Sequence, residues 1–144
     1  MSAFDEVEVG DTIETAARTV TEADIVNFAG VSGDFNDLHL DAEKMADSDY
    51  GERIAMGALV FSMTTGLLWQ ARGTDSGVVA MYGVDELRFV APVFVGDTIS
   101  VESEVVEADP YDHPEASGRV RYEATVTNQR EDVVLTCQLL ALVR

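Results

Sequence analysis

The chain has 144 residues, 47% of them hydrophobic, and a formal net charge of −18 that arises from 27 acidic and 9 basic side chains. Phosphate groups bind basic surfaces, so this charge argues against nucleic acid and anionic membranes as partners. No apolar run approaches the ~18 residues of a membrane span, and residues 1–6 lack the basic region of a secretory signal, so we expect one cytoplasmic domain over residues 1–144.

The first third of the chain predicts a strand followed by helical segments. Residues 13–20 alternate loosely between apolar and polar types, which indicates a strand. Thr21 begins a pattern like a capping box, and the apolar face after it predicts a helix that ends at Gly30. Residues 31–41 predict a polar loop, which is followed by a short helical turn through Ala46.

The remainder predicts one long helix and then a sheet. Residues 58–72 are nearly all apolar and predict about four helical turns, buried on most sides. After Gly73 the period changes to two and β-branched residues are enriched, which predicts four antiparallel strands. The predicted strands cover residues 78–91, 98–108, 117–128 and 133–143, with turns at 92–97, 109–115 and 128–132. A buried helix against a curved antiparallel sheet is an α+β fold.

The segment 33–41 carries the side chains best suited to chemistry. Asp34 and His39 place a carboxylate and an imidazole five positions apart, whereas the only other histidine, His113, is expected on the surface. Acid–base chemistry on a water molecule requires such a pair. Gly57 begins the long apolar helix, and a helix N-terminus offers free N–H groups and a positive dipole end. A base, an acid and an oxyanion donor are therefore all present.

Three segments carry a resemblance to a known family. Residues 33–41 read GDFNDLHLD, residues 54–59 read IAMGAL, and residues 87–98 read LRFVAPVFVGDT. They resemble the motifs Gly-Asp-x-Asn-Pro-x-His-x-Asp, Ile-Val-His-Gly-x-Leu and Phe-x-x-Pro-Val-x-x-Gly-Asp of the MaoC-like (R)-specific enoyl-CoA hydratase family. Asp37 replaces the proline of the first motif, and Met56 replaces the histidine of the second. The resemblance implies a hot-dog fold, in which an antiparallel sheet wraps around a long central helix.

The resemblance also implies a reaction, the hydration of a trans-2-enoyl-CoA to a 3-hydroxyacyl-CoA or the reverse dehydration. Asp34 and His39 would act through one water; either can be the base, and we prefer Asp34 as base with His39 as its proton partner. Asn36 would hold the loop or orient the water. The Gly57 N–H would polarise the thioester carbonyl, although this glycine could instead serve a tight turn. Metals and cofactors are not required.

The acyl-CoA thioester needs an apolar slot, which the resemblance places beside the central helix at an interface between two chains. We therefore expect a homodimer or a multimer of dimers, with sheets joined edge to edge. Ser62 and Thr65 are candidates to line the slot, but packing with their hydroxyls bonded to the preceding turn is slightly favoured. Asp41 is expected to cap a helix. The sequence does not select among the cations available for the CoA phosphates, which are Lys44, Arg53, Arg72 and Arg88.

Two other functions remain open. A hot-dog acyl-CoA thioesterase would add water to the carbonyl carbon and usually has a carboxylate on or near the central helix, but residues 58–72 contain none. A non-catalytic module that binds acyl thioesters is the other alternative, in which Asp37 and Met56 would mark loss of activity.

Two compositional features add further expectations. The acidity, with Lys44 as the only lysine, resembles that of proteins from salt-accumulating halophiles, although an ordinary acidic cytosolic protein remains an alternative. Cys137 is the only cysteine and lies in an alternating apolar run, so we expect a buried thiol and no internal disulfide.

Overall fold

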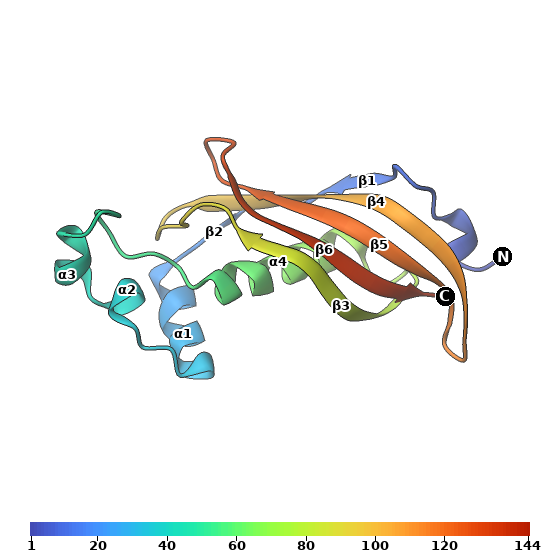
Figure 1. The fold of residues 1–144 in the computed structure, drawn as a ribbon, viewed down its shortest axis with the longest axis horizontal. Helices are drawn as coiled ribbons and strands as arrows, with labels where there is room; N and C mark the ends of the chain where they lie inside the picture. The colour runs from blue at the N-terminus through green and yellow to red at the C-terminus, as the bar shows by residue number, and fades with distance from the viewer.

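The computed structural model describes residues 1–144 and places one long helix across the inner face of a curved antiparallel sheet (Figure 1). Three short helices lie beyond the N-terminal end of the long helix. The elements are η1 (Phe4–Glu6), β1 (Thr12–Glu14), β2 (Arg18–Thr19), α1 (Glu22–Ser32), α2 (Asp37–Leu40), α3 (Ala42–Ala46), α4 (Gly57–Arg72), β3 (Val78–Phe89), β4 (Thr98–His113), β5 (Ala116–Thr127) and β6 (Val133–Val143). This is the α+β hot-dog arrangement expected from the sequence.

The six-stranded sheet has the order β1-β4-β5-β6-β3, and β2 pairs with β4. All pairs are antiparallel. Burial alternates along β5 with a period of two, because successive side chains of a strand point to opposite faces. The inward face packs on α4, and β3 forms one edge of the sheet.

The central helix α4 has two different faces. Its buried residues recur at helical spacing and pack on the sheet; they are Leu59, Val60, Met63, Thr64, Leu67 and Leu68. The opposite face contains Ala58, Ser62, Gly66 and Trp69, which are exposed in the single chain. Burial on most sides, expected from the apolar composition, therefore holds for only one face of the helix in one chain.

Several predicted boundaries were wrong. The single strand over residues 13–20 is split into β1 and β2, both of which pair with β4. Helix α1 continues past Gly30 to Ser32, because Gly33 adopts a left-handed conformation (φ 76°) and its N–H donates to the Ala29 carbonyl. The polar loop over residues 31–41 contains helix α2.

The predicted turn at residues 109–115 was also too long. Strand β4 continues to His113, and Pro110 pairs with Gly118 of β5. A proline is tolerated there because the ladder is irregular between Pro110 and His113. Cys137 is buried in β6, as expected.

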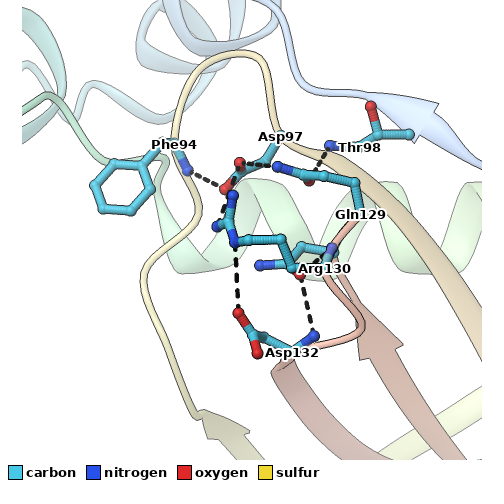
Figure 2. A network of polar contacts seen from close by, with 7 residues as sticks. Phe94, Asp97, Thr98, Gln129, Arg130 and Asp132 are labelled. Carbon is cyan, nitrogen blue, oxygen red and sulfur yellow. Dashed lines mark hydrogen bonds and ion pairs between the residues drawn. The ribbon is translucent and has the colours of Figure 1, made fainter.

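A polar network connects the turn after β3 to the β5–β6 hairpin (Figure 2). The buried carboxylate of Asp97 accepts hydrogen bonds from the Phe94 N–H and from Gln129 Nε2, each 2.9 Å long. Gln129 Oε1 in turn accepts from the Thr98 N–H at 3.0 Å. The network holds residues 92–97 in the position from which they contact the segment that leads into α4.

None of the helices combines the length and the apolar composition needed to cross a membrane.

Candidate active site

His39 is held by α2 with a defined ring orientation. The Asn36 side chain caps this helix by accepting from the Leu38 N–H at 3.0 Å. The His39 ring is buried, and its Nδ1 lies 2.7 Å from the carbonyl oxygen of Ile54. Because a carbonyl oxygen only accepts hydrogen bonds, Nδ1 carries the proton and Nε2 is the ring nitrogen available for proton exchange.

Asp34 lies beside that available nitrogen. Its Oδ2 is 3.4 Å from His39 Nε2, and the side chain is 47% exposed, against 9% for His39. The left-handed turn at Gly33 directs the chain from α1 toward α2, and Asp34 Oδ1 accepts from the Asn36 N–H at 3.2 Å. The structure thus brings together the two residues singled out from the sequence, with the carboxylate on the solvent side.

An apolar cavity of about 510 Å³ adjoins the imidazole. Ten of its 13 lining residues are hydrophobic. The lining includes His39, Tyr50, Gly57, Val60 and Phe89. Gly57 is the first residue of α4, whose N-cap Met56 makes no side-chain hydrogen bond to the helix. The first N–H groups of a helix have no intrahelical acceptor, so this end of α4 presents donors and a positive dipole end to the cavity.

Gly57 packs closely against the ring of Phe89. A Cβ at this position would lie 2.7–2.8 Å from three ring carbons of Phe89. Its φ is not in the left-handed region, so the tight turn considered as an alternative role does not demand glycine. Phe89 itself is exposed on its other side.

The remaining predicted residues occupy supporting positions. Asn36 caps α2 and is not among the residues that line the cavity. Asp41 caps α3, because its Oδ1 accepts from the Lys44 N–H at 2.9 Å. The predicted capping role of Asp41 is therefore confirmed.

Ser62 and Thr65 do not line the cavity in the single chain. The Ser62 hydroxyl donates to the Ala58 carbonyl at 2.8 Å, and the Thr65 hydroxyl donates to the Ser62 carbonyl at 2.7 Å. These are the bonds to the preceding turn that were the favoured alternative.

The two departures from the family motifs have simple structural consequences. Asp37 is the first residue of α2, a position where proline and acidic residues are both favourable, and its carboxylate lies 2.7 Å from Lys44 Nζ. That hydrogen bond raises the pKa of Lys44. Met56 is buried in the hydrophobic core, so an apolar contact stands where the motif has an imidazole.

Three of the four cations named as candidates for the CoA phosphates are paired with carboxylates. Lys44 pairs with Asp37, Arg53 lies 2.8 Å from Glu22, and Arg88 lies 3.6 Å from a neighbouring glutamate. The hydrogen bond from Arg53 lowers the pKa of the Glu22 carboxyl. Arg72 is far from His39, at the other end of α4.

Sequence reasoning missed the carbonyl of Ile54, which sets the His39 tautomer, and the aromatic walls formed by Tyr50 and Phe89. Every residue has a backbone carbonyl, so no residue type in the sequence indicates the role of the Ile54 carbonyl. Phe89 lay within a recognised motif, but only the fold places its ring on Gly57.

Comparison with known proteins identifies the family of this chain. Residues 5–128 match the family described as MaoC like domain. Protein MaoC of Klebsiella aerogenes is 46% identical over 101 residues, which are 68% of this chain but only 29% of that protein. The (R)-specific enoyl-CoA hydratase of Aeromonas caviae is 38% identical over 99 residues, covering 69% of this chain and 71% of that one.

Solved structures share the whole fold. A structure described as a monoamine oxidase regulatory protein from Archaeoglobus superposes with a TM-score of 0.89 at 42% identity, covering 98% of this chain and 93% of that chain. The Aeromonas caviae (R)-hydratase superposes with a TM-score of 0.80 at 29% identity, covering 96% and 98%. Because the family match covers residues 5–128, which include the Asp34–His39 pair, α4 and strands β1–β5, the chain belongs to the MaoC-like domain family.

Proposed function

We propose that this protein is a hydro-lyase that adds water to trans-2-enoyl-CoA to form (R)-3-hydroxyacyl-CoA, or catalyses the reverse dehydration. The observation that carries the proposal is the 3.4 Å contact between Asp34 Oδ2 and His39 Nε2 beside a largely apolar cavity. The similarity to a protein named (R)-specific enoyl-CoA hydratase supports the choice of substrate and stereochemistry.

In the hydration direction Asp34 is the base. Its carboxylate is half-exposed, so water reaches it, and its Oδ2 is close enough to His39 for one water to contact both groups. Asp34 removes a proton from this water as the water oxygen bonds to C3 of the enoyl group. The electrons of the C2–C3 double bond then move toward the thioester carbonyl.

His39 supplies the second proton. The protonated ring gives its Nε2 proton to C2, because Nδ1 is engaged by the Ile54 carbonyl and takes no part. His39 is then neutral and Asp34 carries the proton from water. Transfer from the Asp34 carboxyl group to Nε2 across the short contact restores both groups, and the same steps in reverse remove water.

The N-terminal end of α4 stabilises the charge that develops on the thioester oxygen. Gly57 lines the same cavity as His39, so a carbonyl in that cavity can accept from its N–H. In enzymes that catalyse acyl transfer, one hydrogen-bond donor to the oxyanion raises kcat by a factor of about 10²–10³. Side chains of the largely apolar wall would contact the acyl chain.

The proposal includes a homodimer. Strand β3 is an edge strand with exposed Met81 and Tyr82, and the exposed face of α4 carries Trp69, which is 55% exposed. A second copy joined along β3 would cover both surfaces and would extend the cavity wall at Phe89, which is also exposed.

The direct test mixes purified protein with crotonyl-CoA in high salt and follows the absorbance of the conjugated enoyl thioester. Hydration removes this absorbance without releasing a thiol, and chiral analysis of the product should give the (R)-alcohol. Asp34→Asn and His39→Gln should each lower kcat by about 10²–10⁴, the usual effect of losing a general acid or base.

Two surface variants serve as controls. His113→Gln removes the other histidine, and Asp112→Asn removes an exposed carboxylate. Both residues lie at the β4–β5 hairpin, far from the cavity, and neither variant should change kcat.

Release of free thiol from the acyl-CoA would instead identify a thioesterase. Absence of both signals in folded protein would leave a module that only binds acyl thioesters and would refute the lyase.

A further inference from the structure

A second cavity, of about 260 Å³, lies at the C-terminal end of α4, about 22 Å along the helix from Gly57. Its wall is formed by Arg72, by residues of β4 and β5, and by the N-terminal segment that contains η1. Figure 1 shows this segment at the end of the molecule opposite to α1–α3. Nothing in the proposed hydratase mechanism uses this cavity.

Arg72 in this cavity has no ionic partner. No carboxylate oxygen lies within 4.0 Å of its guanidinium, although five other arginines of the chain have such a partner. One hydrogen bond leads from Nη2 to Ser103 Oγ at 3.1 Å, and the guanidinium stacks 4.1 Å from the centre of the Tyr122 ring. Burial lowers the pKa of Arg72, which reflects the cost of a desolvated charge.

The inner wall is therefore suited to a carboxylate. A guanidinium has five N–H donors in a planar fork that matches a carboxylate, and only one of them is used within the chain. Ser103 and Tyr122 also line the cavity, and their side chains, 2% and 8% exposed, each carry a hydroxyl. Together with the half-buried Arg72, these groups form a cationic, hydrogen-bonding wall.

The outer wall has the opposite charge. Glu6, Asp11 and Asp75 line the same cavity and are exposed. A simple anion bound at Arg72 would be repelled by these carboxylates, and a simple cation would be repelled by Arg72. A ligand that carries both charges, with its carboxylate inward and an ammonium group outward, satisfies both walls.

We propose that this cavity binds a small zwitterion of the α-amino acid type. Arg72 and the two hydroxyls hold the carboxylate, and the carboxylates of Glu6 and Asp75 hold the ammonium group. The site is independent of the hydratase proposal, because it shares no residue with the first cavity.

The test uses isothermal titration calorimetry on the full chain, with each natural α-amino acid in turn and with acetate and methylammonium as half-ligands. At least one amino acid should give saturable heat and, at about a hundred times its Kd, raise Tm by roughly 5–10 °C. Acetate should bind at least 10-fold more weakly, and methylammonium should not bind.

The variants separate binding at Arg72 from general effects of a solute. Arg72→Met and Arg72→Lys should abolish or weaken the heat at least 10-fold, because neither retains the planar fork. Arg119→Met is the matched control, since Arg119 stacks on Tyr111 at 4.6 Å outside this cavity, and it should bind like the parent protein. Circular dichroism confirms that each variant is folded.

The pair Glu6→Gln and Asp75→Asn tests the outer wall and leaves Arg72 unchanged. It should weaken the amino acid and strengthen acetate. Equal binding of acetate and amino acids, unchanged by this pair, would overturn the zwitterion assignment in favour of a simple anion site. Absence of saturable heat with every probe would overturn the site altogether.

Discussion

At the residue scale, the reaction proposed for the first cavity relies on backbone groups as much as on side chains. The Ile54 carbonyl engages Nδ1 of His39 and so leaves Nε2 as the nitrogen for the proposed proton exchange, and the Gly57 N–H lacks an intrahelical acceptor because a helix begins there. A side chain at position 57 would collide with the Phe89 ring. The proposed roles of Asp34 and His39 therefore depend on this arrangement of the backbone.

The glycine can be tested directly. Gly57→Ala should displace the Phe89 ring, lower the free energy of unfolding by about 1–3 kcal/mol and lower kcat with it. Phe89→Leu, a smaller side chain, should restore part of both losses in the double variant, as urea unfolding and crotonyl-CoA hydration would show. Gly30→Ala is the control: it lies within α1 with nothing within 4 Å of the new Cβ, and should be neutral or stabilising. Equal behaviour of the two glycine variants would contradict the packing role.

Cys137 gives a second prediction at this scale. Burial raises the pKa of its thiol from 9.0 to about 11, so the reactive thiolate is scarce at neutral pH. A maleimide at pH 7 should label the protein only after unfolding. The folded chain binds the proton of the Cys137 thiol more tightly than the unfolded chain does. The resulting contribution to the free energy of unfolding is therefore complete below about pH 9 and is lost as the pH rises through about 11. Cys137→Ala should lose this alkaline dependence, and rapid labelling of folded protein would disprove the burial.

At the scale of elements, the start of α4 is held by the turn that precedes β4. The Ala55 N–H donates to the Val93 carbonyl at 2.7 Å, and Ile54 forms a β-bridge with Phe94. The Asp97 network of Figure 2 holds that turn. These contacts, which lie outside the six-stranded sheet, position the segment whose carbonyl orients His39.

Asp97→Ala should therefore affect both stability and activity. The change leaves the Phe94 N–H and Gln129 Nε2 without their acceptor, which costs about 1–3 kcal/mol for buried donors. Because the same turn holds Ile54, kcat should fall as well. Asp132→Ala in the same network is the control, since its side chain is 64% exposed and its loss should cost less than ~0.5 kcal/mol. Both variants are measured by the midpoint of urea unfolding and by kcat. If Asp132→Ala lowers these two quantities as much as Asp97→Ala does, the proposed role of Asp97 is wrong.

At the scale of the whole molecule, net charge opposes compactness. The chain carries −18 formal charges, and self-repulsion is screened over about 3 Å at 1 M salt but over about 30 Å at 0.01 M. A dimer would bring two such chains together, so its interface should be the first structure to weaken as salt is removed.

Dialysis from high to low salt should dissociate the dimer and then unfold the chain. Size-exclusion chromatography and circular dichroism on the same samples follow the two steps. Trp69→Glu on the exposed face of α4 should give a monomer even in high salt, whereas Gln70→Glu adds the same charge at the next position and serves as its control. Retention of fold and dimer at low salt would exclude the halophile interpretation.

Much of the fold could be predicted because its signals are local. The period of two identified β3–β6, and the apolar run identified α4. Boundaries that depend on partners could not be predicted: β4 is longer than expected because β5 pairs with its proline-containing end, and the strand over residues 13–20 is divided because β1 and β2 contact different parts of β4.

The sequence by itself determined which residue types were available: one carboxylate–imidazole pair on a polar segment, one glycine at the start of an apolar helix, and an excess of acidic residues. Only the tertiary structure decided their arrangement. It placed Asp34 beside Nε2 of His39, set the tautomer through the carbonyl of Ile54, and left the half-buried Arg72 without an ion-pair partner. Distances between residues far apart in the chain arise from packing of the whole sheet on α4, and local patterns do not encode them.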